Sequence, residues 1–346
     1  MKAPSWQVLG RPFGPLYGRL MTWRAWAYRR RLFAVTRLPV PVVSVGNLTL
    51  GGTGKTPLVV HLARLAQAHG RRPAVVSRGY RGTAAGPVTV VSRGGPPLID
   101  AATAGDEPFL MARLLPGVPV IISRRRALAG WHAVRELAAD LVILDDGFQH
   151  LALARDLDIV LLAGETPFGN GRIFPGGLLR EPASALARAQ VLVLTGQGAD
   201  RPAPDLAALL DRLAPGCPVF ASHYQPKDLV DAGQERQSLA AVQGLPAFAF
   251  SGIGNPDSFA ATLRAAGVTV AGHRAFADHH AYSRADLERL TAAALRCGAR
   301  WLVTTEKDLV RLGPRPDSPL PLRALTVAPR VAAGFDRLFL DWLAGP

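Results

Sequence analysis

At residues 49–56 the sequence reads Thr49-Leu50-Gly51-Gly52-Thr53-Gly54-Lys55-Thr56. An apolar, β-branched run at 42–45 precedes this segment, and an apolar run with helical spacing follows it from Pro57. Strand, glycine-rich loop and helix in this order are typical of a phosphate-binding loop. Glycines let the backbone turn tightly, so that consecutive N–H groups point inward, and the helix start adds the positive end of its dipole. The segment therefore predicts an anion site built from the backbone.

The last two residues of the loop make a nucleoside triphosphate the expected anion. Lys55 can reach the β- and γ-phosphates, and the Thr56 hydroxyl can ligate Mg²⁺. The strict pattern has Gly where this chain has Thr49, although Gly51 and Gly52 supply flexibility slightly later. The alternative is a glycine-rich turn that caps an ordinary helix. Only four of the 40 Lys and Arg residues are lysines, and one of them occupies the position that needs a slender point charge.

Composition places the chain among globular proteins. Its 346 residues are enough for two domains, and 49% hydrophobic with 19% charged residues excludes a disordered chain. Cys217 and Cys297 are too few for a disulfide framework or a cysteine-based zinc site, which fits a reducing cytosolic location, although one bridge is also permitted. The net charge of +14 predicts a polyanionic partner, unless it reflects a general preference for arginine.

The first 40 residues are basic and aromatic and contain no acidic residue. Arginines interrupt every apolar run here, which excludes a cleavable signal peptide, and no run reaches the ~20 apolar residues of a transmembrane helix. Basic residues with Trp, Tyr and Leu at near-helical spacing predict a segment on an anionic membrane surface. A helix docked on the protein's own core is the compatible alternative.

Further along, apolar runs alternate with helical segments in βα order. Because the runs are continuously apolar, we expect a parallel sheet covered on both faces, with ligands at the carboxyl ends of its strands. The predicted strands are 42–45, 73–76, 118–122, 141–144, 159–162, 191–194, 246–250, 268–270 and 301–304, with a short hairpin strand at 88–91. The predicted helices are 57–69, 109–115, 124–138, 199–216, 256–266 and 283–296.

These elements give a predicted fold class of α/β: an α/β/α P-loop core with a mostly parallel sheet, and a smaller C-terminal α/β domain. We place the basic N-terminal segment at 1–40, the core at 41–224 and the smaller domain at 245–346. Residues 225–244 are polar and are expected to be a connector.

Two carboxylates, Asp145 and Asp146, end the apolar strand 141–144. In a P-loop protein, an acid at the end of a neighbouring strand holds Mg²⁺ directly or through water. A turn is the alternative, because Asp-Asp-Gly is also good turn chemistry. The following Gly147-Phe148-Gln149-His150 is unusual for a generic ATPase.

Three other polar clusters stand out. Asp106 starts a predicted helix and is read either as an N-cap or as a functional acid. Asp278-His279-His280 could bind metal or form an acid/base pair, although no further ligands with suitable spacing are obvious. Thr304 to Asp308 follows a strand and uses another rare lysine, Lys307. Because Lys307 and Asp308 are adjacent, the guanine-reading pattern Asn-Lys-x-Asp is absent and GTP specificity is not supported.

Together these residues resemble the tetraacyldisaccharide 4′-kinase family, from about Val42 to Arg311. Thr49 in place of Gly matches the loop of that family. The resemblance is carried by the following ordered motifs: Val45-Gly46-Asn47-Leu48-Thr49, Gly51-Gly52-Thr53-Gly54-Lys55-Thr56-Pro57, Ser77-Arg78-Gly79-Tyr80, Gly105-Asp106-Glu107-Pro108, Asp145-Asp146-Gly147-Phe148-Gln149-His150, Leu179-Arg180-Glu181, Asp278-His279 and Thr305-Glu306-Lys307-Asp308.

The resemblance implies transfer of the γ-phosphate of ATP to the 4′-hydroxyl of tetraacyldisaccharide 1-phosphate, which gives lipid IVA. It implies Asp106 as the base near the acceptor, supported by His279, with Lys55 also in the catalytic set. Asp145, Asp146 and Glu181 would lie with Thr56 around Mg²⁺ and the phosphates.

The implied partners are the lipid substrate and an anionic membrane, with peripheral association at the cytoplasmic face of the inner membrane. We expect no nucleic acid and infer no obligate protein partner. The alternative function is a membrane-associated P-loop ATPase switch that transfers no phosphate to lipid.

Overall fold

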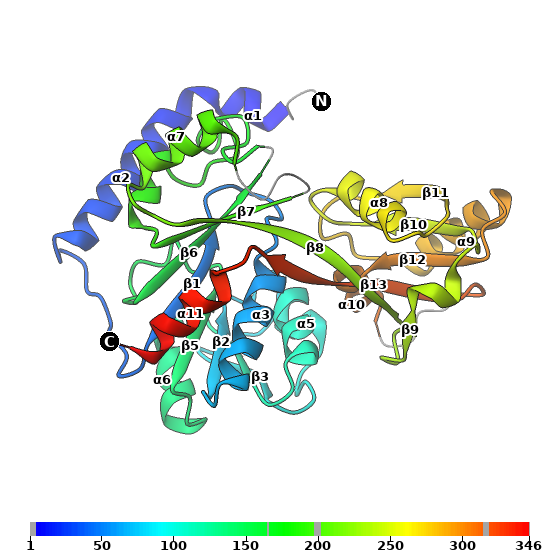
Figure 1. The fold of residues 1–346 in the computed structure, drawn as a ribbon, viewed down its shortest axis with the longest axis horizontal. Coiled ribbons are helices and arrows are strands. Elements are labelled where there is room, and N and C mark those ends of the chain that lie inside the picture. The colour runs from blue at the N-terminus through cyan, green and yellow to red at the C-terminus, as the bar shows by residue number, and fades with distance from the viewer. Residues whose placement is uncertain (1–4, 165, 197–201, 314–317, 346) are drawn as a thin grey trace.

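The computed structural model describes residues 5–164, 166–196, 202–313 and 318–345. Two lobes share one 13-stranded sheet with the order β11-β10-β12-β13-β8-β7-β6-β1-β5-β2-β4-β3, and β9 pairs with β8 (Figure 1). Neighbouring strands are parallel except in the pairs β13–β8, β8–β9 and β3–β4. The predicted mostly parallel α/β architecture with a smaller C-terminal part is confirmed.

The strands of this sheet are β1 (Val42–Asn47), β2 (Pro73–Ser77), β3 (Thr89–Arg93), β4 (Pro119–Ile122), β5 (Leu141–Asp145), β6 (Leu157–Ala163), β7 (Val191–Thr195), β8 (Val219–Val230), β9 (Arg236–Ser238), β10 (Ala247–Ser251), β11 (Val270–Ala275), β12 (Trp301–Thr305) and β13 (Leu322–Val331). The helices are α1 (Ser5–Gly10), η1 (Arg11–Phe13), α2 (Gly14–Arg29), α3 (Lys55–Ala68), α4 (Ala101–Ala104), α5 (Asp106–Leu114), α6 (Arg126–Glu136), η2 (Ala183–Arg188), α7 (Pro204–Leu213), η3 (Leu239–Val242), α8 (Pro256–Ala265), α9 (Arg284–Arg296), α10 (Glu306–Leu312) and α11 (Phe335–Ala344).

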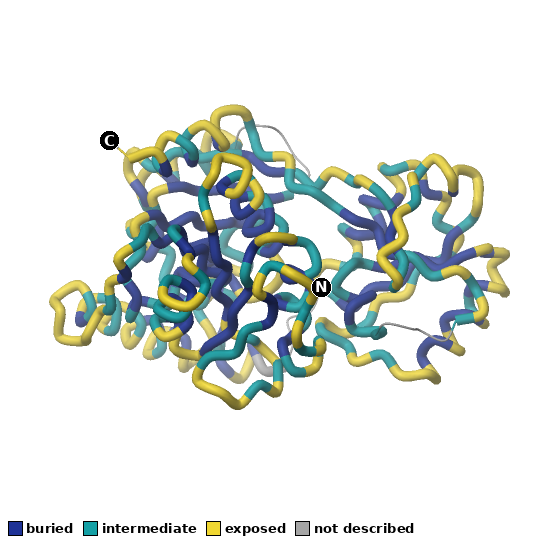
Figure 2. Tube along the Cα trace, turned by 90° about the horizontal axis from the view of Figure 1, so that it is seen from below, coloured by how far each residue is buried: buried dark blue, intermediate teal, exposed yellow. Residues whose placement is uncertain are grey.

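The large lobe has three layers because its central strands are apolar on both faces. In β5, Leu141 and Ile143 pack into one core cluster with α3 and α5, while Val142 and Leu144 pack into another with α6. Alternate side chains of a strand point to opposite faces, so one continuous apolar run serves both layers. The central strands are buried and the exposed residues lie on the outer helices and loops (Figure 2). The edge strand β3, expected as part of a hairpin, pairs antiparallel with β4.

The small lobe repeats this layering around β10 and β12. Ala247 and Ala249 belong to a cluster with α8, whereas Phe248 and Phe250 belong to a cluster with α9. Ser283 is the N-cap of α9 and forms a capping box with Asp286, which fixes where the helix begins. Each lobe therefore has its own apolar core.

The lobes are joined by β8 and β13, which run antiparallel from one lobe into the other (Figure 1). The segment 225–244, expected as a polar connector, consists largely of the second half of β8, the short strand β9 and η3. Alternation of polar and apolar residues, as in a strand with one exposed face, explains its polar composition. The link is therefore hydrogen-bonded sheet.

The C-terminal helix α11 returns to the large lobe, although the sequence assigned all of 245–346 to the smaller domain. Phe335 and Phe339 are fully buried in the cluster that covers β1 and α3. His61 of α3 and Asp336 of α11 lie 2.7 Å apart. A pattern of apolar residues defines the face of a helix that is buried, but does not specify the lobe that buries it.

The N-terminal helices dock on the large lobe through small residues. A Cβ on Gly14 would lie 2.9 Å from the carbonyl oxygen of Ile173, and one on Gly18 would lie 2.7 Å from Ile173 Cδ1. The opposite side exposes large apolar residues, namely Leu9, Phe13, Leu16, Leu20 and Trp23.

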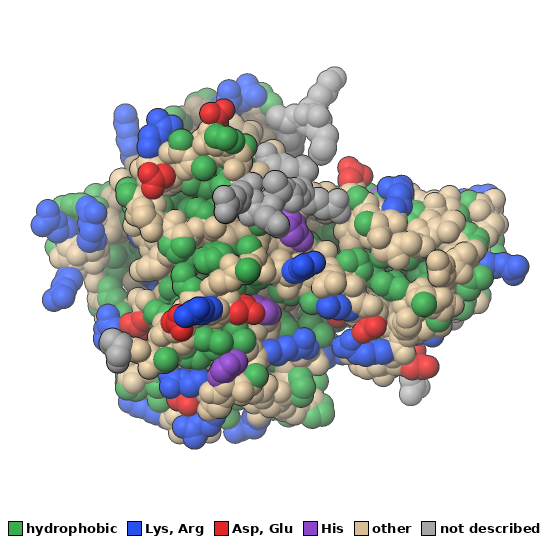
Figure 3. Space-filling model, in the orientation of Figure 1, with side chains coloured by type: hydrophobic (Ala, Val, Ile, Leu, Met, Phe, Trp, Pro, Cys, Tyr) green, Lys and Arg blue, Asp and Glu red, His purple; other side chains and the backbone are tan. Residues whose placement is uncertain are grey.

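The segment therefore docks on the core of the protein and also exposes an apolar face, while its contact with an anionic membrane stays a prediction. Lys and Arg side chains gather at the outer end of α2 (Figure 3). Within the described ranges, no helix has the length and apolarity needed to cross a bilayer. Lys2 and the predicted helical residues 199–201 lie outside those ranges.

Candidate active site

A cleft of about 1310 Å³ lies between the two lobes and extends to the N-terminal helix α2. It opens at the carboxyl ends of the large-lobe strands, where an α/β sheet places its ligands. Its walls include the loop 50–56, the acids after β5, the start of α5 and the loop around His279 of the small lobe. Positive and negative side chains mingle along the boundary between the lobes (Figure 3). The predicted site residues line this cleft except for Thr49, which is buried at the start of the loop, and Glu181.

The loop after β1 has the conformation expected of a phosphate-binding loop. The buried Asn47 side chain donates to the carbonyl oxygen of Thr49 at 2.7 Å, which holds the start of the loop. Gly54 has φ 80° at the helix start, a conformation that favours glycine. A Cβ at this position would also lie 1.4 Å from the Tyr224 hydroxyl of β8. Burial raises the pKa of Tyr224 to about 12, so its hydroxyl stays protonated against the loop.

Lys55 points from the first turn of α3 toward Asp146, with 3.5 Å between Nζ and Oδ1. Arg180 donates to both oxygens of the same carboxylate, at 2.9 and 2.8 Å. Burial alone would raise the pKa of Asp146, but the charges of Lys55 and Arg180 outweigh it and lower the pKa to about 2. The carboxylate therefore stays ionised and keeps two cations at the position where phosphates are expected.

Asp145 is almost completely buried beside this pair. One oxygen accepts a hydrogen bond from Ser77 at 2.9 Å, whereas Oδ1 has no hydrogen-bond partner in the structure. Burial raises the pKa of Asp145 to about 7, and the negative charges of Glu107 and Asp146 add to the effect. Asp145 and the buried Thr56 both line the cleft, and an unpartnered carboxylate oxygen together with a hydroxyl is a donor set that fits a hard divalent cation.

The described residues contain no group of three or more His, Cys, Asp or Glu that could hold a metal ion on its own. Mg²⁺ commonly takes only one or two carboxylates and completes its shell with water and phosphate oxygens, so the acids after β5 still suit it. Glu181, predicted as a fourth member, is placed elsewhere. Its carboxylate lies 3.0 Å from Arg188, whose guanidinium lies over the ring of the buried Phe148. Glu181 does not line the cleft.

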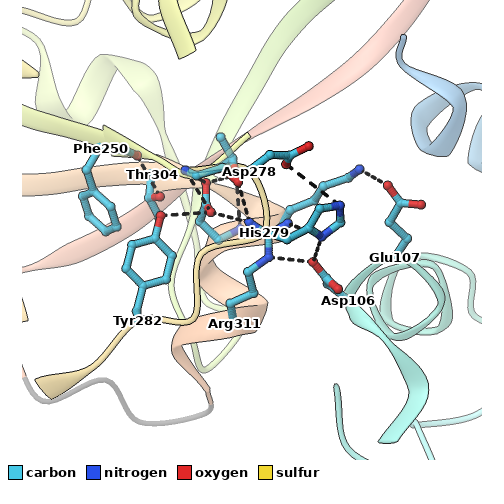
Figure 4. A network of polar contacts seen from close by, with 12 residues as sticks. Asp106, Glu107, Phe250, Asp278, His279, Tyr282, Thr304 and Arg311 are labelled. Atoms are coloured by element: carbon cyan, nitrogen blue, oxygen red, sulfur yellow. Dashed lines mark hydrogen bonds and ion pairs between the residues drawn. The ribbon is translucent and has the colours of Figure 1, made fainter. Parts of the chain in front are cut away.

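Asp106 and His279 meet across the cleft, although 173 positions separate them in the chain. His279 Nδ1 lies 2.9 Å from Asp106 Oδ2, and Arg311 Nε donates to the same oxygen at 2.6 Å (Figure 4). Asp106 begins α5 in the large lobe, whereas His279 and Arg311 belong to the small lobe. The predicted pair is thus adjacent, with an arginine that the sequence did not predict.

This arrangement sets the protonation state of Asp106. Burial would raise its pKa, but the hydrogen bond with His279 and the charge of Arg311 hold the pKa well below its usual range. Both side-chain contacts go to Oδ2. Within the described residues no side-chain hydrogen bond to Oδ1 is seen.

Arg311 is positioned by the loop and helix on which it depends. Its NH1 group donates to the carbonyl oxygen of Gly252 at 2.7 Å and to Asp308 at 2.8 Å. The fully buried Asp308 also accepts hydrogen bonds from Tyr282 and from the side chain of Thr305. This network fixes the end of α10 against the loop after β10, so the guanidinium reaches Asp106 in one orientation.

The neighbouring His280 has a different environment from His279. Its Nε2 lies 3.1 Å from Asp286, and its ring stacks on Phe276 at 4.5 Å. Asp286 belongs to the cap of α9. The pair of histidines therefore divides into one that faces the cleft and one that supports the lobe.

Lys307 and Glu107 form a second ion pair between the lobes, one position along from Asp106 (Figure 4). The charge of Lys307 lowers the pKa of Glu107, so both partners stay ionised. Both residues line the cleft. The rare lysine noted in the sequence thus faces the acids of the large lobe.

Arg311, Arg180 and Tyr224 have contacts that the sequence alone did not predict. Arg180 belongs to the motif Leu179-Arg180-Glu181, but of this motif only Glu181 was predicted to lie near Mg²⁺ and the phosphates. Arg311 follows Asp308 by three positions and so shares a helical face with it, but nothing local signals a partner on α5. Tyr224 lies in the segment joining the lobes, where its packing against Gly54 depends on the tertiary structure.

A family model described as tetraacyldisaccharide-1-P 4′-kinase matches residues 6–344. A tetraacyldisaccharide 4′-kinase of Desulfotalea psychrophila is 42% identical over 97% of this chain and 96% of its own length. One of Geobacter metallireducens is 46% identical over 86% of each chain. The structure of LpxK from Aquifex aeolicus in complex with ATP superposes with a TM-score of 0.79, at 33% identity, and the match covers 96% of this chain and 97% of that one. The chain belongs to the tetraacyldisaccharide-1-P 4′-kinase family.

Proposed function

We propose that this protein transfers the γ-phosphate of ATP to the 4′-hydroxyl of a tetraacyldisaccharide 1-phosphate and so forms lipid IVA. The observation that carries the proposal is the Asp106–His279 pair, which joins the lobes in the same cleft as the phosphate-binding loop. An acid that can accept a hydroxyl proton and a loop that can hold a triphosphate are the two parts that an alcohol kinase needs.

In the proposed reaction, the 4′-oxygen attacks the γ-phosphorus and the bond to the β–γ bridging oxygen breaks. Backbone N–H groups of the loop and Lys55 hold the triphosphate and stabilise the charge that moves to the leaving oxygen. Asp106 Oδ1 orients the hydroxyl and accepts its proton late in transfer. A carboxylate with a lowered pKa suits this order of events, because the hydroxyl becomes strongly acidic only as the new O–P bond forms.

His279 and Arg311 would hold Asp106 ionised and fix its orientation. Since they belong to the small lobe, the pair is complete only when the lobes are close together. Closure would also exclude water, which limits hydrolysis of ATP without transfer.

Asp145, Asp146 and the Thr56 hydroxyl are the residues that we propose for Mg²⁺. When bound there, the ion would neutralise phosphate charge. Arg180 and Lys55 already neutralise Asp146, so Asp145 is the stronger candidate for direct coordination.

We also propose that α1 and α2 hold the protein at the cytoplasmic face of the inner membrane. The exposed row of large apolar residues on these helices is flanked by arginines, and such a face binds anionic lipid surfaces. The cleft extends to the same helix, with Tyr17 and Met21 in its wall. A substrate with four acyl chains could therefore keep its chains near the bilayer.

The test is incubation with γ-labelled ATP, Mg²⁺ and detergent-solubilised tetraacyldisaccharide 1-phosphate, followed by mass spectrometry of the lipid. We expect a bis-phosphorylated product. Loss of a general base typically costs about 10²–10⁴-fold, so Asp106→Ala should lower turnover by that order while ATP affinity changes little. The exposed Asp341→Ala on α11 is the matched control.

If Asp106→Ala lowered turnover and ATP affinity equally, Asp106 would have only a structural role as the cap of its helix. ATP hydrolysis without any phosphorylated lipid would instead support the membrane-associated ATPase switch. The family relationship does not favour that alternative.

A further inference from the structure

His279, which contacts Asp106 across the cleft, has a backbone conformation that is uncommon for a residue with a side chain. Its φ is 60°, in the left-handed region. Six described non-glycine residues have such a positive φ, and three of them, Arg81, Asp146 and His279, line the cleft. Strained conformations of this kind persist only where neighbouring contacts hold them. His279 therefore depends on contacts that keep its turn from relaxing.

The strained residue lies in a tight turn between β11 and α9. The N–H of His280 donates to the carbonyl oxygen of Ala277 at 3.1 Å, which makes His279 the third residue of a β-turn. A positive φ at this position is typical of glycine or asparagine. The N–H of His279 donates to the carbonyl oxygen of Gly252 at 3.0 Å, in the loop after β10. These bonds attach the turn to the sheet, and a side chain attaches it to α9.

That side chain is His280. Its Nε2 lies 3.1 Å from Asp286 Oδ2, and its ring centroid lies 4.5 Å from that of Phe276 and 4.9 Å from that of Tyr282. Phe276 precedes the turn and Tyr282 follows it, so the imidazole packs between the two strands of chain at the base of the turn. His280 therefore links both ends of the turn to the start of α9.

Asp286 is held in place as a partner because it belongs to the capping box of α9. Its Oδ2 also accepts hydrogen bonds from the backbone N–H of Ser283 at 3.0 Å and from the Ser283 hydroxyl at 2.7 Å. These bonds, with a smaller effect of His280, lower the pKa of Asp286 to about 2, so its carboxylate is ionised and only accepts. His280 Nε2 therefore carries the hydrogen, and the link from the turn to the helix is charge-assisted.

Two contacts with the large lobe depend on the direction in which the turn presents His279. Its Nδ1 lies 2.9 Å from Asp106 Oδ2, and its carbonyl oxygen accepts a hydrogen bond from Arg81 Nη1 at 3.2 Å. Rotation about φ moves the side chain and the carbonyl group together, relative to the N–H that is bonded to Gly252. A turn that relaxed to a negative φ would therefore lose both contacts.

We propose that His280 is a positioning residue for phosphate transfer, because its link to Asp286 holds the turn 277–280 in the left-handed form that keeps His279 against Asp106. This inference rests on the proposed function for the identity of the reaction. His280 does not line the cleft, so it acts through His279 and not on a substrate. The two adjacent histidines thus belong to two aspartate pairs, one that crosses the cleft and one that orients the first.

The experiment measures phosphate transfer to the tetraacyldisaccharide 1-phosphate for two variants of His280. His280→Phe keeps an aromatic ring but loses the donor, whereas His280→Gln keeps a donor near the position of Nε2. We expect His280→Phe to lower kcat by roughly 10–100-fold, as for a catalytic group misplaced by about 1 Å, with little change in KM for ATP. His280→Gln should recover most of this loss, and His69→Phe, at an exposed histidine after α3, should match wild type.

The effect should disappear once Asp106 is removed, because His280 acts only through the pair. In the background of Asp106→Ala, His280→Phe should lower kcat by less than about twofold, since residues that act as a unit are non-additive. The Nδ1–H resonance of His279 in NMR spectra, assigned by its loss in His279→Gln, gives a readout that needs no turnover. It should disappear in His280→Phe and remain in His280→Gln.

Equal falls of kcat in the two backgrounds would show a merely structural role and overturn the inference, as would an unchanged His279 resonance in His280→Phe. Asp286→Asn tests the same link from its other partner, should His280→Phe fail to fold. It should lower kcat by a smaller factor, and full activity would refute the link. If wild type transfers no phosphate, the proposed reaction fails, whereas loss of the resonance in His280→Phe alone would still support the positioning.

Discussion

Asp106 illustrates how neighbouring charges assign roles at the scale of single residues. His279 and Arg311 of the small lobe both contact the Oδ2 atom of this carboxylate. The pKa of Asp106 is lowered, whereas burial and two nearby carboxylates raise the pKa of Asp145 to about 7. Two acids of the same type are therefore separated in pKa by their surroundings, which is typical of catalytic sites.

Arg311→Lys should lower turnover by roughly 10–100-fold, because Lys cannot span Asp106, Gly252 and Asp308 with one planar group. It should also raise the pKa of Asp106 and move the acid limb of the kcat/KM profile to higher pH. The pH–rate profile measures this shift, with the exposed Arg289→Lys as control. A uniform fall in rate at every pH would mean that Arg311 only stabilises the fold.

Glu306 gives a pH-dependent prediction for stability. Burial raises its pKa to about 7, against the opposing charges of Arg236, Arg64 and Arg113. The folded state therefore binds this proton more tightly than the unfolded state does, and the contribution to stability falls as pH rises from about 4.5 to about 7.

Glu306→Gln should remove that dependence, so the variant should gain a few degrees in Tm relative to wild type at pH 8 and little at pH 4.5, since 1 kcal/mol corresponds to about 1–2 °C for a chain of this length. Thermal unfolding monitored by circular dichroism at both pH values measures it. The exposed Glu288→Gln on α9 should leave the wild-type curve intact. An equal Tm change at both pH values would contradict the assigned cause.

At the scale of elements, α2 combines two faces with different partners. Gly14 and Gly18 of α2, with Gly10 at the end of α1, are spaced by four residues and let one face approach Ile173 and Pro175 closely. The exposed row at Leu9, Phe13, Leu16, Leu20 and Trp23 repeats after three or four residues, as one stripe of a helix does. Docking through small residues therefore creates the apolar outer face.

Leu16→Glu with Leu20→Glu should weaken binding to vesicles that contain anionic lipid by at least about tenfold, because both leucines are more than half exposed and lose apolar contact with the bilayer. Stability should change little, as for other exposed positions. Vesicle co-sedimentation and thermal unfolding measure the two effects. Leu295→Glu, on a similarly exposed residue of α9, is the matched control. Unchanged vesicle binding would exclude this face as the membrane contact.

At the scale of the whole molecule, two lobes with separate cores are joined by one pair of strands, and the cleft lies between them. Contacts across the cleft include the ion pairs Asp106–Arg311 and Glu107–Lys307. Polar contacts that bridge a cleft are easier to break than an apolar interface, so they suit lobes that must separate to exchange substrates.

Lys307→Met should lower kcat/KM by about tenfold or more, because it leaves Glu107 unpaired beside the other acids and disfavours closure. Small-angle scattering should show a larger radius of gyration for the variant. The double variant Glu107→Gln with Lys307→Met removes the unpaired charge and should recover part of the lost kcat/KM and of the compact shape. A compact variant with full activity would show that this pair does not hold the lobes together.

The sequence by itself determined the α/β class, the phosphate-binding loop, the acids after β5 and the family. These features are local, since a loop that wraps phosphate and an apolar strand that ends in acids are each written within about ten residues. The candidates Asp106 and His279 also came from the sequence, although their pairing did not.

Only the tertiary structure decided which residues share a site. It brought Arg311 to Asp106, placed Glu181 against Arg188 rather than in the cleft, and returned α11 to the large lobe. Periodicity predicts which face of an element is buried, but long-range charge pairing depends on which elements the fold sets side by side.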